Sequence, residues 1–305
     1  MPDPRRRNGF ALIVVLNIIV ILSGIAIVAA QGAREGAAIS ANLRSDAQQR
    51  SLAEGAMAVA AERLLSAEAG RRWQPDGRPY RIHLFSAEAA VSIQDESGKL
   101  NLNTTDEVTL AAAFTNAGVA SSKAQALAAA IVDWRDPDSE RRLSGAERPD
   151  YMALGISGAP ANSPFNRVDE LRGVLGMTDE SYKTIALLVT AYPGDSSVRL
   201  DVAPLPVLTA LFGRGSPEIS AILARRSNSN SVFGGVANAV GVSRSDGLTR
   251  QVGSATAATY SVTVALPKGA ATRFFRGAFR LQQDSSGPRM AVLEPMALVP
   301  IDQAQ

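Results

Sequence analysis

The hydrophobic and polar positions of the chain begin with a helical pattern of unusual length. Residues 10–30 contain no charged side chain, and residues 31–69 contain no proline and keep an apolar stripe at helical spacing. Such a stripe, with charged residues mostly on the other face, is typical of an amphipathic helix. Because no proline separates the two segments, we expect one continuous helix over residues 10–69, about 90 Å long at 1.5 Å per residue.

After this helix the pattern changes from strand to helix and back to strand. Two short segments read as strands, residues 80–85 and 90–94. Helical spacing then appears in five segments, which are residues 110–114, 122–134, 167–174, 180–191 and 219–226, with Thr104 or Thr105 as the N-cap of the first. Three strands close the chain, residues 260–266, 274–282 and 290–298, with a hairpin turn at Lys268 and Gly269. We therefore expect an α+β fold, in which the long helix packs on an antiparallel sheet and a large all-α domain is inserted between strands.

Composition and charge narrow the class of protein. A chain of 305 residues that is 46% hydrophobic can bury a sizeable core in one or two domains. The sequence pI of about 9.1 looks basic, but the formal charge is only +2, and the four charged residues before Phe10 account for all of it. The body of the chain is therefore neutral. The absence of cysteine excludes a disulfide framework and thiolate chemistry.

The N-terminal apolar run has the length of a membrane span. It extends over 21 residues, and a membrane-spanning helix needs about 20. Arg5, Arg6 and Arg7 precede it, which predicts a cytoplasmic N-terminus and places everything after Gln31 outside. Two alternatives stay open. One is a secretory signal cut before Gln31, after the small residues 28–30, and the other is an ordinary signal anchor.

The stretch RRRNGF that ends at Phe10, followed by the long helix, resembles the N-terminus of type IV pilins and pseudopilins. The resemblance implies that a prepilin peptidase cuts between Gly9 and Phe10 and methylates Phe10. Members of that family mostly carry glutamate at the fifth mature position, where this chain has Val14. A buried charge is costly unless it is paired, so a subunit with Val14 cannot receive a neighbour's N-terminal amine in the usual way. Val14 therefore favours a position at the filament tip, unless it is simply one more lipid-facing aliphatic residue.

Three phrases in the middle of the chain add to this resemblance: DESGKLNLNT at 95–104, DWRDPDSERRLSGAERPDY at 133–151 and SPFNRVDELRGVLGM at 163–177. Together with the Gly9–Phe10 junction and the missing glutamate, they resemble the K-type minor pseudopilin of the bacterial type II secretion system, the general secretion pathway protein K family. The resemblance implies a pilin-like fold with the following domains: a leader at 1–9, a transmembrane segment at 10–30, a pilin-like α/β domain at 31–95 and 250–305, and an inserted helical domain at 96–249.

The same resemblance implies a role in assembly. Members of the family form a complex with the I-type and J-type minor pseudopilins at the tip of the periplasmic pseudopilus, where they initiate or cap assembly and support export of folded proteins across the outer membrane. The implied partners are these subunits, other pseudopilus subunits, the prepilin peptidase and the bacterial inner membrane, with the C-terminal domain in the periplasm. Contact with secreted substrates or with the secretin is left open.

Acidic residues gather in the second of the three phrases. The candidates for a metal site are Asp136, Asp138 and Glu147, with Asp133 and Asp150 as further candidates. Crowded carboxylates suit a hard cation such as calcium, although the spacing is not that of an EF-hand. The K-type family carries calcium in its helical domain, which agrees with this prediction. The alternative is a solvated acidic loop held by the neighbouring arginines, Arg135, Arg141, Arg142 and Arg148.

Two other functions receive less support. Residues 101–135 loosely resemble helix-hairpin-helix units, which leaves open an anchored or exported binding protein with a DNA-binding domain. However, residues 95–195 carry 15 acidic and 9 basic side chains, a net charge of −6, where a phosphate binder should be neutral or basic. No GxSxG, P-loop or HExxH motif occurs, and the one histidine, His83, lies in a predicted strand. We therefore expect neither nucleic-acid binding nor enzymatic activity.

Overall fold

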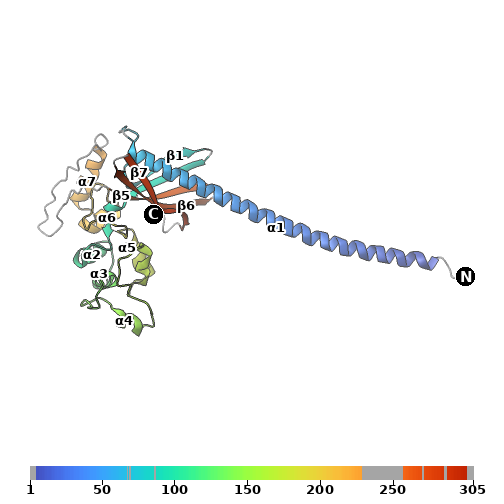
Figure 1. Cartoon of the computed structure of the whole chain (residues 1–305), viewed down its shortest axis with the longest axis horizontal. Helices are drawn as coiled ribbons and strands as arrows, with labels where there is room; N and C mark the ends of the chain where they lie inside the picture. Colours follow the sequence, from blue (N-terminus) through green and yellow to red (C-terminus); the bar gives the residue numbers. More distant parts are fainter. Residues whose placement is uncertain are drawn as a thin grey trace. The chain divides into compact units, whose positions relative to one another are not determined.

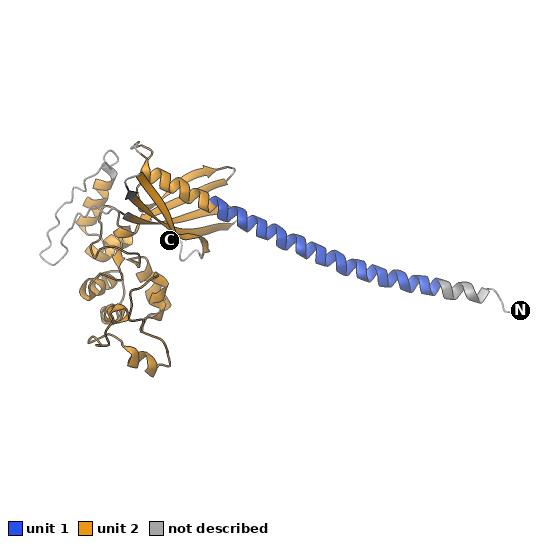
Figure 2. Ribbon diagram, viewed as in Figure 1, with its two compact units in different colours: residues 1–52 blue, residues 53–305 orange. Residues whose placement is uncertain are grey.

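The computed structural model describes residues 5–66, 68, 70–85, 87–228, 257–269, 271–284 and 287–300. It divides into two compact units, residues 1–52 and 53–305 (Figure 2). One helix, α1 (Arg5–Leu65), makes up the described part of the first unit and continues into the second (Figure 1). It begins five residues before the predicted start, because arginine is a good helix former and Gly9 is tolerated inside a helix. It ends before residue 69, at a turn in which Arg72 Nε donates to Ser66 O at 2.8 Å.

The first unit presents a continuous apolar surface over residues 12–28. Every described side chain from Leu12 to Arg44 is exposed, and the aliphatic residues up to Val28 expose 40–70% of their surface. This part of α1 is long and apolar enough to cross a membrane. Exposed apolar surface on this scale marks a segment that a membrane or other helices cover.

The second unit contains a five-stranded antiparallel sheet with the strand order β1-β2-β5-β6-β7. The strands are β1 (Asp76–Leu84), β2 (Ala87–Asp95), β5 (Ala257–Lys268), β6 (Ala271–Asp284) and β7 (Gly287–Val299). The last turns of α1 pack on the sheet and bury Ala53, Ala56, Met57, Ala60 and Ala61, which lie on one face of the helix. The predicted strands and the C-terminal meander are thereby confirmed.

The helices lie between β2 and β5, two neighbouring strands of the sheet (Figure 1). They are α2 (Glu107–Asn116), α3 (Ser121–Arg135), α4 (Arg148–Ala153), α5 (Asp179–Ala186), α6 (Leu205–Phe212) and α7 (Pro217–Asn228), with the 3₁₀ helices η1 (Glu96–Gly98) and η2 (Val168–Gly173). They share a hydrophobic core of their own, in which Phe114, Ile131 and Tyr151 are fully buried. The helical insertion is therefore confirmed, whereas its expected end at residue 249 lies outside the described residues.

Four details of the insertion differ from the prediction, and the first is that α4 lies where no helix was predicted. The helix expected over residues 180–191 ends at Ala186, because the β-branched Val189 and Thr190 form β4 (Val189–Thr190) and pair in parallel with β3 (Leu100–Asn101). The segment expected as a helix over 167–174 is the 3₁₀ helix η2. The N-cap of α2 is Asp106, whose carboxylate accepts the N–H of Thr109, and not a threonine.

A buried ion pair lies where the chain leaves the sheet for the insertion. Lys99 Nζ is 2.9 Å from Glu96 Oε1, and Ser261 Oγ on β5 hydrogen-bonds the same oxygen. Burial alone would raise the pKa of Glu96, but the charges of Lys99 and Arg276 and the bond from Ser261 lower it below its usual range. The pair therefore joins the base of the insertion to the sheet.

Candidate metal site

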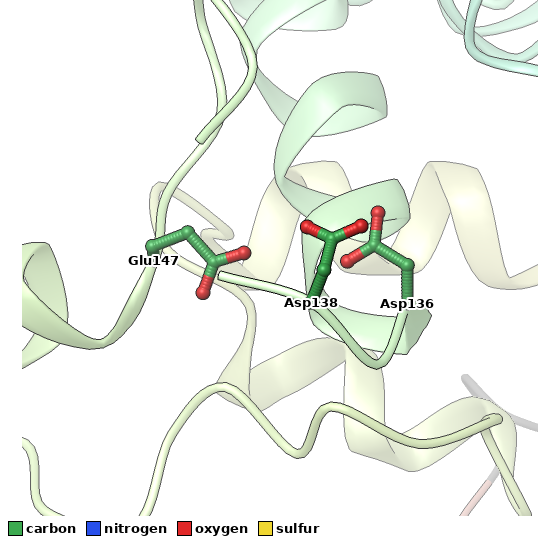
Figure 3. Close-up of side chains that lie close together, drawn as sticks. All are labelled: Asp136, Asp138 and Glu147. Carbon is green, nitrogen blue, oxygen red and sulfur yellow. The ribbon is translucent and has the colours of Figure 1, made fainter. Parts of the chain in front are cut away.

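Three of the five predicted ligands converge at the end of α3. Asp136 and Asp138 lie on the turn that follows this helix, and Glu147 faces them from the segment just before α4 (Figure 3). One carboxylate oxygen from each residue lies within 4.8 Å of the other two. The residues that the sequence favoured as ligands are thus brought together in space.

The local sequence explains the turn that carries the two aspartates. Pro137 cannot continue a helix and disfavours helical geometry in the residue before it, so α3 ends at Arg135 and Asp136 becomes its C-cap. Asp138 Oδ1 accepts the N–H of Glu140 at 2.8 Å. Asn162 Nδ2 donates to the carbonyl of Asp138 at 2.6 Å, which ties the turn to a distant loop.

Glu147 is held by its backbone and not by its side chain. It is the N-cap of α4, and its N–H donates to Asp150 Oδ2 at 2.9 Å. The residue is 2% exposed, and no side chain among the described residues bonds either carboxylate oxygen, although the backbone at the start of α4 lies close to them. Asp136 Oδ1 likewise has no hydrogen-bond partner within the described part of the chain. A buried carboxylate without a counter-charge carries a large desolvation cost, so a cation next to these oxygens would be stabilising.

The electrostatics of the site agree with this geometry. Burial raises the pKa of Glu147, and the neighbouring Asp133, together with Asp136 and Asp138, raises it further. Burial and the concentrated negative charge therefore disfavour ionisation of Glu147. A bound divalent cation reverses that local balance, because it would be the largest charge in the site.

The other two candidates are engaged by the protein. Asp133 is fully buried and lies 2.9 Å from Arg142 Nη1, whereas Asp150 caps α4 and lies 3.3 Å from Arg141 Nη1. A Cβ atom at Gly145 would overlap Asp133 Oδ2, so this glycine lets the loop close over the aspartate. Arg142 was one of four arginines expected to hold the acidic loop in the alternative interpretation, and its ion pair with Asp133 agrees with that expectation. The role of Gly145 was not predicted.

The donor set fits a hard cation. The three converging groups are carboxylates, which offer only oxygen, and calcium binds oxygen ligands in flexible geometry. The described cluster contains no nitrogen or sulfur ligand of the kind that softer transition metals prefer. The buried oxygens of Glu147 and Asp136 that lack a counter-charge distinguish this cluster from an ordinary exposed acidic loop.

Aromatic residues pack around Trp134, which lies next to Asp133 in the sequence. Trp134 immediately follows Asp133 on α3, stacks on Phe165 with ring centroids 5.9 Å apart, and meets Tyr151 edge-on at 6.0 Å. The ring also lies close to Gly173, where a Cβ atom would come within 2.7 Å of it. Trp134 is 8% exposed, as expected for a packing residue next to the acidic turn.

The residues predicted for processing and assembly lie on α1. Gly9 and Phe10 are within its helical backbone, and the surroundings of their side chains lie outside what the structure describes. Val14 is 40% exposed. It therefore belongs to the apolar surface of the first unit.

Comparison with known proteins shows similarity to one family. Residues 90–194 match the family model described as type II secretion system (T2SS), protein K. Protein K of Pseudomonas aeruginosa is 29% identical over 153 residues, which cover 47% of this chain and 45% of that protein. Protein K of Pectobacterium carotovorum is 26% identical over 235 residues, which cover 68% of this chain and 71% of that protein. The match thus spans less than half of the Pseudomonas protein.

A solved structure shares the fold. It is the crystal structure of the GspK-GspI-GspJ complex from the enterotoxigenic Escherichia coli type 2 secretion system, with a TM-score of 0.53 and 17% sequence identity, covering 84% of this chain and 99% of the matched one. The fold is that of a pilin-like subunit with a helical domain inserted between two neighbouring strands. Over residues 90–194 the chain matches the type II secretion system protein K family, and the relatives of that name and the solved structure agree with this match.

Proposed function

We propose that the protein is a minor pseudopilin at the tip of the periplasmic pseudopilus, where it joins the I-type and J-type minor pseudopilins and initiates or caps assembly. The observation that carries this proposal is the helical insertion between β2 and β5, attached to a pilin-like helix and sheet. Such bulk would obstruct a further subunit above it. The matched crystal structure is a complex of GspK with GspI and GspJ, which supports the choice of partners.

A crosslinking experiment in living cells tests the position. The chain contains no cysteine, so a single Ser40→Cys change on the exposed face of α1 gives one reactive site in the full-length protein. We expect crosslinks to the I-type or J-type subunit, and none from Thr115→Cys on the surface of α2. Abundant crosslinks between copies of this chain would instead place it along the filament body and contradict the tip position.

Processing by the prepilin peptidase is part of the same proposal. Cleavage between Gly9 and Phe10 would leave a chain that starts at Phe10, and methylation would add one methyl group to it. Sequencing the N-terminus and weighing the intact protein from its own cell measures both changes. A start at Gln31 would indicate a removed signal and a released protein, and an intact Met1 would indicate a plain anchor.

We also propose that Asp136, Asp138 and Glu147 bind calcium. The bound ion would supply the positive charge that the buried oxygens of Glu147 and Asp136 lack among the described residues. The test follows thermal unfolding of the full-length protein by tryptophan fluorescence. Trp73→Phe leaves Trp134 as the only tryptophan, beside the site. We expect millimolar calcium to raise the midpoint above that in EDTA, and an unchanged midpoint would refute the site.

A further inference from the structure

One guanidinium is bonded directly to the candidate metal site. Arg142 Nη1 lies 2.9 Å from Asp133 Oδ1 and 2.6 Å from Asp136 Oδ2. The Nε of the same side chain lies 3.4 Å from Glu107 Oε2 on α2. A single positive charge therefore connects α2, the end of α3 and the loop that follows α3.

The backbone fixes this arginine in place. Its N–H donates to Asp133 Oδ2 at 3.3 Å, and its carbonyl accepts the N–H of Gly145 at 3.0 Å. Gly145 allows this approach, because a side chain there would overlap the carboxylate of Asp133. Although the Arg142 side chain is 36% exposed, it is held from both ends and differs from a mobile surface arginine.

The arginine divides the acidic cluster into two parts. It bonds both Asp133 and one oxygen of Asp136, so these groups have a counter-charge without any metal. Asp136 Oδ1 and both oxygens of Glu147 are left buried and without a positively charged side chain bonded to them in the part of the chain that the structure describes. One guanidinium thus satisfies half of the cluster and leaves the other half for a second cation.

We propose that Arg142 is a positioning residue that acts as a built-in counter-cation for the metal site. It keeps Asp133 and Asp136 in place while the metal is absent, and by binding Asp136 Oδ2 it leaves Oδ1 free for the metal. This inference rests on the proposed calcium site and adds to it that the metal-free protein keeps a preformed site. Without Arg142, the folded state depends on calcium, because Asp133 is fully buried and loses its counter-charge.

The experiment compares Arg142→Gln with Arg142→Lys and with Arg141→Gln in the full-length protein carrying Trp73→Phe. Arg141 is the matched control, because it is the adjacent arginine and pairs with the cap residue Asp150 instead of the cluster. Unfolding midpoints are measured in EDTA and in millimolar calcium chloride. We expect Arg142→Gln to lower the midpoint in EDTA by on the order of 5 to 10 °C, and calcium to restore at least half of the loss.

The controls separate the outcomes. Arg142→Lys keeps the charge but not the bridging geometry, so its loss in EDTA should be intermediate, and Arg141→Gln should match the parent protein. Equal losses in EDTA and in calcium would show that Arg142 is a structural ion partner unrelated to the metal, and would overturn the inference. Should Arg142→Gln not fold under either condition, Arg142→Lys decides, since a calcium shift no larger than the parent's would also overturn it. If calcium did not change the unfolding midpoint of the parent protein, the proposed calcium site itself would be refuted.

Discussion

Two buried glutamates, one at the start of the insertion and one inside it, show what distinguishes a structural carboxylate from a candidate ligand. Glu96 is 4% exposed and Glu147 is 2% exposed, so burial does not separate them. Glu96 is bonded by Lys99 and Ser261, and its pKa is lowered by these partners despite the opposing effect of burial. The carboxylate of Glu147 has no such partner among the described residues, and burial raises its pKa. The difference shows that the lack of a positively charged partner, and not burial, distinguishes the candidate metal ligand from the structural carboxylate.

A glycine lies close in sequence to each glutamate, and the two glycines differ in the atoms that pack against them. A Cβ atom at Gly98 would lie 2.8 Å from backbone atoms of Val202 and Ala203, which cannot move aside. A Cβ atom at Gly145 would instead meet the side chain of Asp133. The first site is therefore closed by rigid backbone, whereas the second is closed by a charged side chain that depends on its own counter-ion.

The largest effect should come from breaking the satisfied pair. Lys99→Met removes the cation and leaves Glu96 buried and charged, which we expect to cost about 3 to 5 kcal/mol of unfolding free energy. The loss should be the same with EDTA and with calcium, since the pair has no part in the metal site. Denaturant unfolding of the full-length protein measures it. Lys123→Met, at an exposed lysine that bonds Thr178, serves as the control and should change little. A calcium-dependent loss in Lys99→Met would contradict the comparison.

A smaller and calcium-specific effect is expected at the other glutamate. Glu147→Gln keeps the size of the side chain but removes the buried charge, so stability in EDTA should be unchanged or higher. The calcium-dependent stabilisation, about 2.7 kcal/mol at a hundredfold excess over the dissociation constant, should disappear. Thermal unfolding in EDTA and in calcium measures both quantities.

The matched control for this change lies in the same acidic phrase. Glu140 is exposed and contributes only its backbone N–H to the turn, so Glu140→Gln should keep the full calcium response. If Glu147→Gln also kept it, Glu147 would not be a ligand, and its unpartnered oxygens would need another explanation.

The sequence predicted the fold better than it predicted the contacts between side chains in the candidate metal site. Alternating residues identified the strands, and the crowded carboxylates identified Asp136, Asp138 and Glu147 before the structure brought them together. It did not predict which arginine binds the cluster, because Arg135, Arg141, Arg142 and Arg148 are equivalent by sequence distance alone. In the structure Arg135 bonds the carbonyl groups of Leu102 and Thr105, and Arg141 bonds Asp150.

The predicted end of one helix was wrong because tertiary contacts override the local sequence pattern. Val189 and Thr190 fit the helical spacing of the preceding segment, but they pair with Leu100 and Asn101 from almost 90 residues earlier in the chain. The local sequence does not indicate a pairing partner that lies so far away in the chain. The N-cap at Asp106 was missed for a different reason, because the threonines just before it are also good caps and the sequence does not rank them.

The smallest effect is expected at that cap, a carboxylate that is neither buried nor short of partners. Asp106 accepts the N–H and the hydroxyl of Thr109, each at 2.8 Å. Asp106→Ala should cost about 1 kcal/mol of unfolding free energy, with and without calcium. Although partial burial opposes the shift, the bonds from Thr109 lower the pKa of Asp106. The charged cap's contribution is therefore present above the pKa of an unfolded aspartate and is lost as the pH falls through the lowered folded value.

Asp106→Asn tests whether this cap acts through its hydrogen bonds or through its charge. Asparagine caps a helix about as well as aspartate, so most of the unfolding free energy at neutral pH should remain. The loss of stability that protonation of Asp106 causes at acidic pH should be absent from this variant. Unfolding measured across the acidic range separates the two variants. If asparagine were as costly as alanine, the cap would act mainly through its negative charge at the start of α2. Asp106 would then resemble Glu147 in depending on charge, with the N-terminus of a helix in the place of the metal ion.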